Sequence, residues 1–333
     1  MAFDVRRVVT GHDAAGRPVW LSDGTPAATV EAPNGTAVSD LFLLDGPPAG
    51  AAAGGDPTGP RVLEPPPGGC SCRVIRFPPP PPGAPVEEHW VRVPGDDPAR
   101  PGMHATDTLD FMIVLHGRIV LGLDDGEHHL AAGDTVIQRG TDHRWRVEGD
   151  EPCTYLVVML RTDPAAAAPA VSLAPRASAA PTGFGPRRLV TATDGAGRSF
   201  ALLDGEPPLV HTPIGPDGAV MVDLWQTGGP LRRPDQGGDP GGAWELDPLG
   251  GGIAFRLVRL PAGHDPGSRG WHTTPSIDLD LILSGRMELA LPDAGTVVLD
   301  PGDAVIQRAT EHKWQPLGDE AVRMAAVMLT VPV

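Results

Sequence analysis

The sequence predicts an all-β protein built from two tandem barrels that arose by internal duplication. The string GDTVIQRGTDHRW at residues 133–145 returns as GDAVIQRATEHKW at residues 302–314, with nine of thirteen positions identical. Short apolar segments rich in β-branched residues are punctuated by Gly, Asp and Pro, a pattern typical of β-sandwiches and barrels. No helical stretch separates these segments. We therefore expect two copies of one β unit.

The duplicated region is longer than these two strings. Copy one begins with RRVVTGHDAAGRPVWLSDG at residues 6–24, and copy two begins with RRLVTATDGAGRSFALLDG at residues 187–205. An Ala/Pro-rich stretch with no amphipathic period joins the copies and is expected to be a linker. We therefore expect an N-terminal barrel in residues 1–160, the linker in 161–186 and a C-terminal barrel in 187–333.

The expected strands are short, and turn residues end them. LDDG at residues 123–126 predicts a hairpin turn, because Asp and Gly supply the backbone angles that tight turns need. In copy one the expected strand segments are FMIVLHG (111–117), RIVLGL (118–123), HHLAAGDTVIQRG (128–140), HRWRVEGD (143–150) and TYLVVMLR (154–161).

Copy one carries an insertion that copy two lacks. Equivalent positions are 183 residues apart at Pro78/Pro261 (261 − 78) and 168 apart at His104/His272 (272 − 104), so fifteen extra residues lie between them in copy one. The proline run within residues 78–102 predicts a stiff extended segment. We expect an insertion of the kind that surface loops tolerate, and a lid over one site is the alternative.

Charge and hydropathy exclude several classes of partner. The formal net charge is −16 and the basic residues form no block, so the electrostatic footprint of a nucleic-acid or anionic-membrane binder is missing. No apolar run approaches the roughly 20 residues that a membrane span needs, and the polar start lacks the apolar stretch of a secretory signal. We expect a cytoplasmic protein whose partner is a small-molecule substrate.

The motif segments resemble a known family. GRIVLGLDDGEHHLAAGDTVIQRGTDHRW (117–145) and GRMELALPDAGTVVLDPGDAVIQRATEHKW (285–314) resemble the cupin barrel, in which a first motif of His, carboxylate and a closing Gly precedes a second motif of Gly-Asp, apolar strand and His. The resemblance implies a bicupin, with two tandem double-stranded β-helix or jelly-roll barrels. It also leaves open a homodimer, because cupin barrels often pair sheet on sheet.

The resemblance implies one divalent transition metal per barrel, held by two imidazoles and a carboxylate. Strand side chains alternate faces, so residues 104, 106, 108 and 110 are expected to point the same way. Such a triad leaves coordination positions open and suits non-haem Fe(II), while Zn, Mn or Ni accepts the same ligands. The implied ligands are His104, Asp110 and His143 in copy one, and His272, Asp278 and His312 in copy two.

Both copies depart from the family pattern. Thr106 and Thr274 stand where cupins have a second motif-one histidine, and Asp replaces the family's Glu in each copy. The alternative to metal binding is a satisfied polar network in a metal-free pocket. The tryptophans after the motif-two histidines would form either an aromatic wall or a core plug. The expected pocket or neighbouring residues are Thr106, Thr108, Trp145, Thr274, Ser276 and Trp314.

Three function classes follow from these residues. The leading one is a metal-dependent small-molecule enzyme of cupin type, an Fe(II) oxygenase in secondary or degradative metabolism. The second keeps the metal as a Lewis acid for isomerisation, cyclisation or decarboxylation. The third is a non-catalytic bicupin that binds a small molecule. The sequence has no nucleophile elbow, phosphate loop or dinucleotide fingerprint, so hydrolase and nucleotide-dependent classes are not expected.

Overall fold

The computed structural model describes residues 3–93, 95–163, 165, 171–177, 185–212, 218–241 and 244–332. Within these ranges the chain is all-β, with three short 3-10 turns, which confirms the predicted class. No described helix is long and apolar enough to cross a membrane. Copy one contains β1 (Arg7–His12), β2 (Pro18–Gly24), β3 (Thr29–Glu31), β4 (Ala37–Leu44), β5 (Cys70–Phe77), η1 (Val86–Glu88), β6 (Thr108–His116), β7 (Arg118–Leu123), β8 (Gly126–Ala131), β9 (Thr135–Arg139), β10 (Arg144–Val147) and β11 (Cys153–Arg161).

Copy two repeats this order of strands and has one additional 3-10 turn, η2. It contains β12 (Arg188–Thr193), β13 (Ser199–Gly205), β14 (Val210–His211), β15 (Val220–Gln226), η2 (Leu249–Gly251), β16 (Ile253–Leu260), η3 (Gly267–Gly270), β17 (Ser276–Ser284), β18 (Arg286–Leu291), β19 (Gly295–Leu299), β20 (Ala304–Arg308), β21 (Lys313–Leu317) and β22 (Val322–Thr330).

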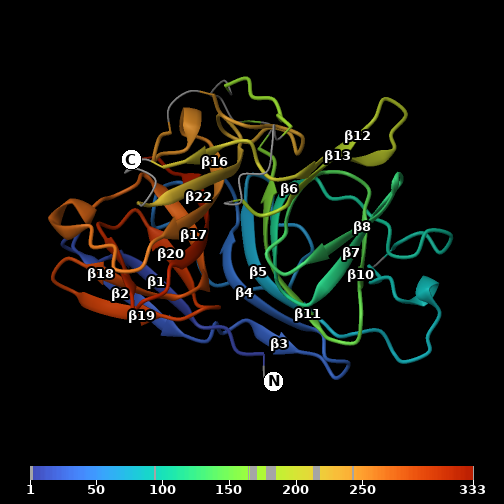
Figure 1. The fold of residues 1–333 in the computed structure, drawn as a ribbon, viewed down its shortest axis with the longest axis horizontal. Coiled ribbons are helices and arrows are strands. Elements are labelled where there is room, and N and C mark those ends of the chain that lie inside the picture. Colours follow the sequence, from blue (N-terminus) through green and yellow to red (C-terminus); the bar gives the residue numbers. More distant parts are fainter. Residues whose placement is uncertain are drawn as a thin grey trace.

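Each barrel pairs an eight-stranded sheet with a three-stranded one. The first barrel has the order β13-β12-β9-β6-β11-β5-β4-β3 and is closed by β10-β7-β8. The second has the order β14-β15-β16-β22-β17-β20-β1-β2 and is closed by β19-β18-β21. The two barrels lie side by side (Figure 1). This arrangement confirms two tandem barrels.

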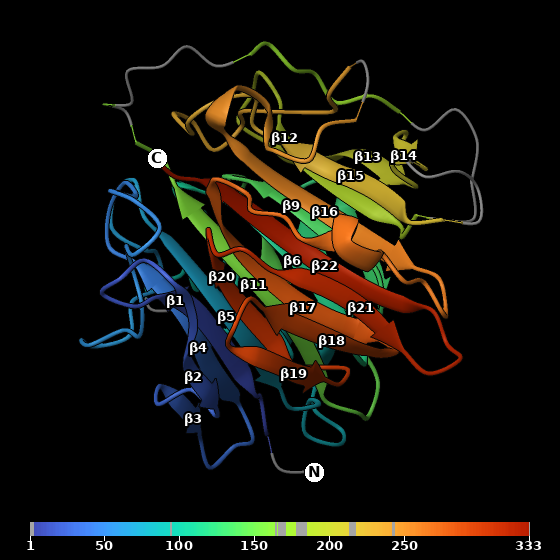
Figure 2. The same cartoon turned by 90° about the vertical axis from the view of Figure 1, so that its left-hand side faces the viewer.

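The two copies exchange their first two strands. β1 pairs in parallel with β20 of the other copy, Arg7 opposite Ala304, and β12 pairs in the same way with β9, Arg188 opposite Thr135. Figure 2 shows β1 beside β20, although the two strands lie near opposite ends of the chain. The sheets therefore cross the limits of the sequence repeat, and each barrel is completed by the other copy.

Side chains alternate between the two faces of the central strands, and they contribute to three separate apolar cores. In β6, Leu109 and Phe111 face a core shared by the two barrels, where the Phe111 and Phe255 rings stack with centroids 5.1 Å apart. The opposite face of the strand, with Met112 and Val114, lines the interior of the first barrel. Because both faces of the strand are buried, its sequence reads as an almost continuous apolar run. A polar residue on the inner face, such as Asp110, therefore lies in a barrel interior.

The backbone conformation at the hairpin between β6 and β7, and at that between β17 and β18, requires a glycine. Gly117 has φ of 75° and Gly285 has φ of 72°, a region that favours glycine. A Cβ on Gly117 would lie 2.4 Å from the carbonyl oxygen of Pro152, and one on Gly285 would lie 2.8 Å from that of Ala321. Both glycines thus allow the strand after motif one to turn tightly against β11 or β22.

The insertion of copy one is only partly a surface loop. Glu87 and Glu88 are exposed, but Trp90 is buried, with 5% of its surface accessible. The backbone N–H of Val91 donates to the carbonyl of Trp145 at 2.8 Å, and the Arg144 guanidinium lies over the Trp90 ring at 3.9 Å. The segment therefore packs along β10 as added cover on the first barrel.

Residues 171–177, a described part of the expected linker, contact a buried ion pair. Arg188 and Asp239 approach to 2.6 Å, and their side chains are 2% and 0% exposed. The backbone N–H of Arg176 donates to the same carboxylate at 2.6 Å, and Ala174 forms a bridge with Asp239. Residues 164, 166–170 and 178–184 of the expected linker lie outside the described residues.

Candidate functional site

In each barrel the two predicted histidines face each other. His104 and His143 form an antiparallel bridge, each backbone N–H donating to the other's carbonyl at 3.0 and 2.9 Å. His272 and His312 repeat the bridge at 3.1 and 3.0 Å. The ring centroids are 4.3 Å apart in both pairs. The structure thus brings together two of the three predicted ligands in each copy.

Backbone carbonyls orient all four imidazoles in the same way. Nδ1 of His104 donates to the carbonyl of Gly102 at 2.9 Å, and Nδ1 of His272 donates to that of Gly270 at 2.8 Å. A carbonyl oxygen only accepts, so Nδ1 carries the proton and Nε2 keeps a lone pair. This is the arrangement that metal-binding histidines commonly show.

The glutamine of the repeated VIQR string positions the motif-two histidine. Gln138 Nε2 donates to the carbonyl of Thr141 at 3.2 Å, and His143 Nδ1 donates to the same carbonyl at 2.9 Å. Copy two has the same two bonds at 3.2 and 2.9 Å, from Gln307 and His312 to Thr310. The repeated motif therefore builds the turn that aims the imidazole.

Burial keeps these motif-two imidazoles neutral. Desolvation, followed by the neighbouring His104, lowers the pKa of His143 to about 3. Desolvation and His272 likewise lower the pKa of His312 to about 3. Both rings are therefore neutral near pH 7, which is the form that binds a metal ion.

The predicted carboxylates are buried and have different surroundings in the two copies. Burial raises the pKa of Asp110 to about 7, and Oδ1 of this residue has no hydrogen-bond partner. Burial raises the pKa of Asp278 to about 6. Thr274 and Ser276 donate to its two oxygens at 3.0 and 2.5 Å. Asp278 is thus oriented by two hydroxyl groups, whereas Asp110 is incompletely bonded.

Imidazoles and carboxylates do not form a preassembled triad. Among the described residues, no group of three or more His, Cys, Asp or Glu side chains is arranged to hold a metal ion. β6 begins only at Thr108 and β17 at Ser276, so His104 and Asp110 do not lie on one continuous strand. That residues 104, 106, 108 and 110 point the same way stays a prediction, and in copy two the equivalent His272, Thr274 and Asp278 line one cavity. In copy one the hydroxyls of Thr106 and Thr108 bond each other at 2.7 Å.

A cavity of about 350 Å³ lies inside the second barrel. It is of a size that takes a small organic ligand. Its wall is mainly apolar and includes three methionines and two tryptophans. The predicted residues of copy two that line it are His272, Thr274, Asp278, His312 and Trp314.

Larger side chains occupy the corresponding positions of the first barrel. Tyr155 of β11 corresponds to Met324 of β22, and its ring stacks on Trp145 with centroids 6.5 Å apart. Phe77, which corresponds to Leu260, contacts the same tyrosine at 5.9 Å. Trp145 therefore belongs to the packed interior of the first barrel, whereas Trp314 lines a cavity.

Sequence reasoning missed Asp280. This residue lines the cavity of the second barrel and lies two positions after Asp278 on the same face of β17. Burial and the charge of Asp278 raise its pKa well above the usual range. The period-2 spacing in IDLDLIL was the available signal, since it places both aspartates on one strand face.

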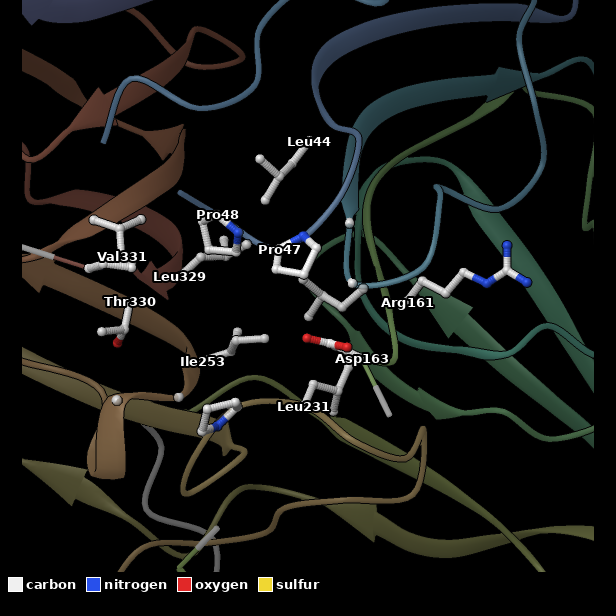
Figure 3. Close-up of a pocket in the computed structure, with 17 residues that line it drawn as sticks. Leu44, Pro47, Pro48, Arg161, Asp163, Leu231, Ile253, Leu329, Thr330 and Val331 are labelled. Atoms are coloured by element: carbon white, nitrogen blue, oxygen red, sulfur yellow. The ribbon is translucent and has the colours of Figure 1, made fainter. Parts of the chain in front are cut away.

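A second cavity of about 440 Å³ lies where the two copies meet. Its lining combines equivalent positions of the two copies, such as Leu160 and Leu329 (Figure 3). Figure 3 shows Asp163 directed toward this cavity and Arg161 running away from it. None of the predicted site residues lines it.

Comparisons with known proteins agree with this architecture. Residues 88–159 match the family described as Cupin domain, and this region holds the first histidine pair. Residues 88–159 are therefore similar to a cupin domain. The putative glyoxylate-induced protein of Pseudomonas aeruginosa shares its fold over 97% of this chain and 95% of that one, with a TM-score of 0.50 and 11% identity.

Two further proteins match shorter stretches of the chain. Phomopsin biosynthesis cluster protein D of Diaporthe leptostromiformis is 50% identical over 52 residues, which are 14% of this chain and 28% of the relative. Oryzines biosynthesis cluster protein J of Aspergillus oryzae is 39% identical over 66 residues, 20% of this chain and 35% of the relative. The match thus spans about a third or less of each relative's length.

Proposed function

We propose that this chain is a bicupin enzyme acting on a small molecule, and that its C-terminal barrel is the working site. One observation carries the proposal: the cavity of about 350 Å³ opens onto the paired imidazoles of His272 and His312. A mainly apolar cavity with a few convergent polar groups is the usual form of a small-molecule site.

His272 and His312 are the residues that would hold a divalent metal, through their free Nε2 atoms. They fit two coordination positions, and among the described residues no carboxylate completes a group of three. Fe(II) bound there would supply chemistry with oxygen, whereas Zn, Mn or Ni would polarise a substrate as a Lewis acid. Of these alternatives, we favour Fe(II) as the metal and oxygenase activity as the reaction.

The chain's own residues supply the rest of the site. Trp314, Met324 and Met328 form an apolar wall that excludes water from the bound molecule. Asp278, with a pKa of about 6, is ionised at pH 7 and is oriented by Thr274 and Ser276, so it is suited to accept a proton. Two relatives bear the names of biosynthesis clusters, which supports a role in secondary metabolism.

A second candidate is a non-catalytic bicupin that binds a small molecule without metal. It is favoured by the absence of a three-ligand group among the described side chains. In that case the histidine pairs and buried aspartates would recognise polar groups of the ligand.

Metal analysis of purified protein and its variants separates the candidates. The enzyme proposal expects bound transition metal in wild type, its loss from the C-terminal site in His312→Ala, and Fe(II)-dependent oxygen uptake with a chelating phenol, enol or keto acid. His143→Ala is the matched variant in the first barrel and should keep that activity. Wild type that takes up no Fe(II), Zn, Mn or Ni on titration would leave only the non-catalytic candidate.

A further inference from the structure

The cavity of the second barrel contains a carboxyl group that the first barrel lacks. Asp280 lies on β17 opposite Ala326 of β22, and the equivalent position of β6, opposite Val157, is Met112. Asp280 is 6% exposed and contributes to the cavity wall. Copy two therefore differs from copy one by a buried polar group at the centre of its interior.

No neighbouring side chain satisfies this carboxylate. The hydroxyls of Thr274 and Ser276 both donate to Asp278. The guanidinium of Arg256, a buried cation in the cavity wall, is bound to Asp223 at 2.6 Å. Among the residues that the structure describes, Asp280 itself makes no hydrogen bond and no ion pair.

A buried polar group without a partner is costly, and such groups in native proteins call for an explanation. Asp278 and Asp280 place two carboxyl groups side by side on one strand face, so a bound cation would relieve both the desolvation and the mutual repulsion. The remaining wall, including Met221, Met324 and Met328, is apolar and suits an organic body.

We propose that Asp280, together with Asp278, binds the ammonium group of a small organic amine whose apolar part lies against the methionine and tryptophan side chains of the cavity. This inference rests on the proposed use of the C-terminal barrel and names the substrate class of that site. Binding of a cation would distinguish this site from the first barrel, where the equivalent residue, Met112, has no carboxyl group.

Isothermal titration with 2-phenylethylamine as the probe, and 2-phenylethanol as its neutral counterpart, tests the inference. Wild type is expected to bind the amine more tightly than the alcohol. Asp280→Met, which installs the residue of copy one, should weaken amine binding by about 30-fold or more, since a buried charge pair loses one partner. The affinity for the alcohol should change little. Equal affinities for the two probes in wild type, or unchanged amine binding in Asp280→Met, would overturn the inference.

Two controls keep the outcome interpretable. Asp110→Asn removes the buried carboxylate of the first barrel and should leave amine binding as in wild type. Asp280→Asn keeps the size of the side chain and should show the same loss as Asp280→Met, which excludes a packing effect. Thermal melting of each variant shows whether it is folded.

The same titrations on metal-free and Zn-loaded protein separate this inference from the proposed enzyme. Amine binding that depends on Asp280 in protein unable to take up metal supports the inference while the metal proposal fails. Metal uptake that depends on His312, without any preference for the amine, refutes the inference alone.

Discussion

The buried ion pair between Arg188 and Asp239 should be the most sensitive contact in the strand exchange. Arg188 belongs to β12, which completes the first barrel, and Asp239 lies in copy two. One guanidinium nitrogen donates at 2.6 Å to both the Asp239 carboxylate and the carbonyl of Leu224. Asp239→Ala removes the carboxylate and leaves a buried, unpaired arginine.

The burial of both side chains determines how much stability Asp239→Ala should lose. Breaking one partner of a buried pair costs about 3–5 kcal/mol, because the other charge stays desolvated. Each kcal/mol lowers the melting temperature of a large domain by roughly 2–4 °C. We therefore expect Asp239→Ala to melt about 10 °C below wild type. Arg188→Met combined with Asp239→Leu should recover most of the loss, since apolar replacement of both partners removes the buried charge.

A neighbouring pair provides the matched control. Arg187, adjacent in sequence, contacts Asp204 at 2.6 Å, but these side chains are 33% and 38% exposed. Exposed pairs contribute about 0–1 kcal/mol, so Asp204→Ala should change the free energy of unfolding little. Calorimetry and urea unfolding of the four proteins measure the comparison. If Asp239→Ala lost no more stability than Asp204→Ala, burial would not be what makes the Arg188 pair important.

Two further predictions concern the barrel interiors. The pKa of Asp110 is about 7 in the folded protein against a usual 3.8, so its stabilising contribution is present below pH 4 and is lost as the pH rises through 7. The free energy of unfolding of Asp110→Asn, relative to that of wild type, should therefore increase by about 3 kcal/mol between pH 5 and pH 8. Urea unfolding of metal-free protein measures this difference. A difference that stays constant with pH would contradict the burial of this carboxyl group. In the second barrel, the double variant Met324→Tyr and Ala326→Val introduces the side chains that the first barrel has at the equivalent positions, and it should fill the cavity. The folded double variant should lose at least about tenfold in affinity for 2-phenylethylamine by calorimetric titration; retained affinity would place the ligand elsewhere.

The two barrels and the two histidine pairs could be predicted from the sequence. The repeated VIQR string and its histidine predict a strand, a turn and an imidazole on one inner face, and Gln138 and His143 are arranged in this way. The predicted three-ligand metal site stays a prediction, because strand alternation alone does not place its ligands. The chain bends between His104 and Thr108, and strand alternation cannot be applied across a bend.

The strand exchange could not be predicted from the repeat. β1 and β12 have closely similar sequences, so either strand suits the edge beside β9 or β20. Pattern alone cannot choose between them. By contrast, differences between the two interiors are visible once the copies are aligned. Comparing Tyr155 with Met324 and Met112 with Asp280 shows which barrel has the smaller side chain and which has the additional carboxyl group.

The exchanged strands have a consequence for how such a chain could originate. A protein of one copy alone would leave the edge of β9 without its parallel neighbour, and two identical molecules could supply that neighbour to each other. Joining two such molecules head to tail would preserve every pairing while turning a reciprocal dimer into one covalent unit. Afterwards the two halves are free to diverge in their interiors, but neither can be removed without opening a sheet edge in the other.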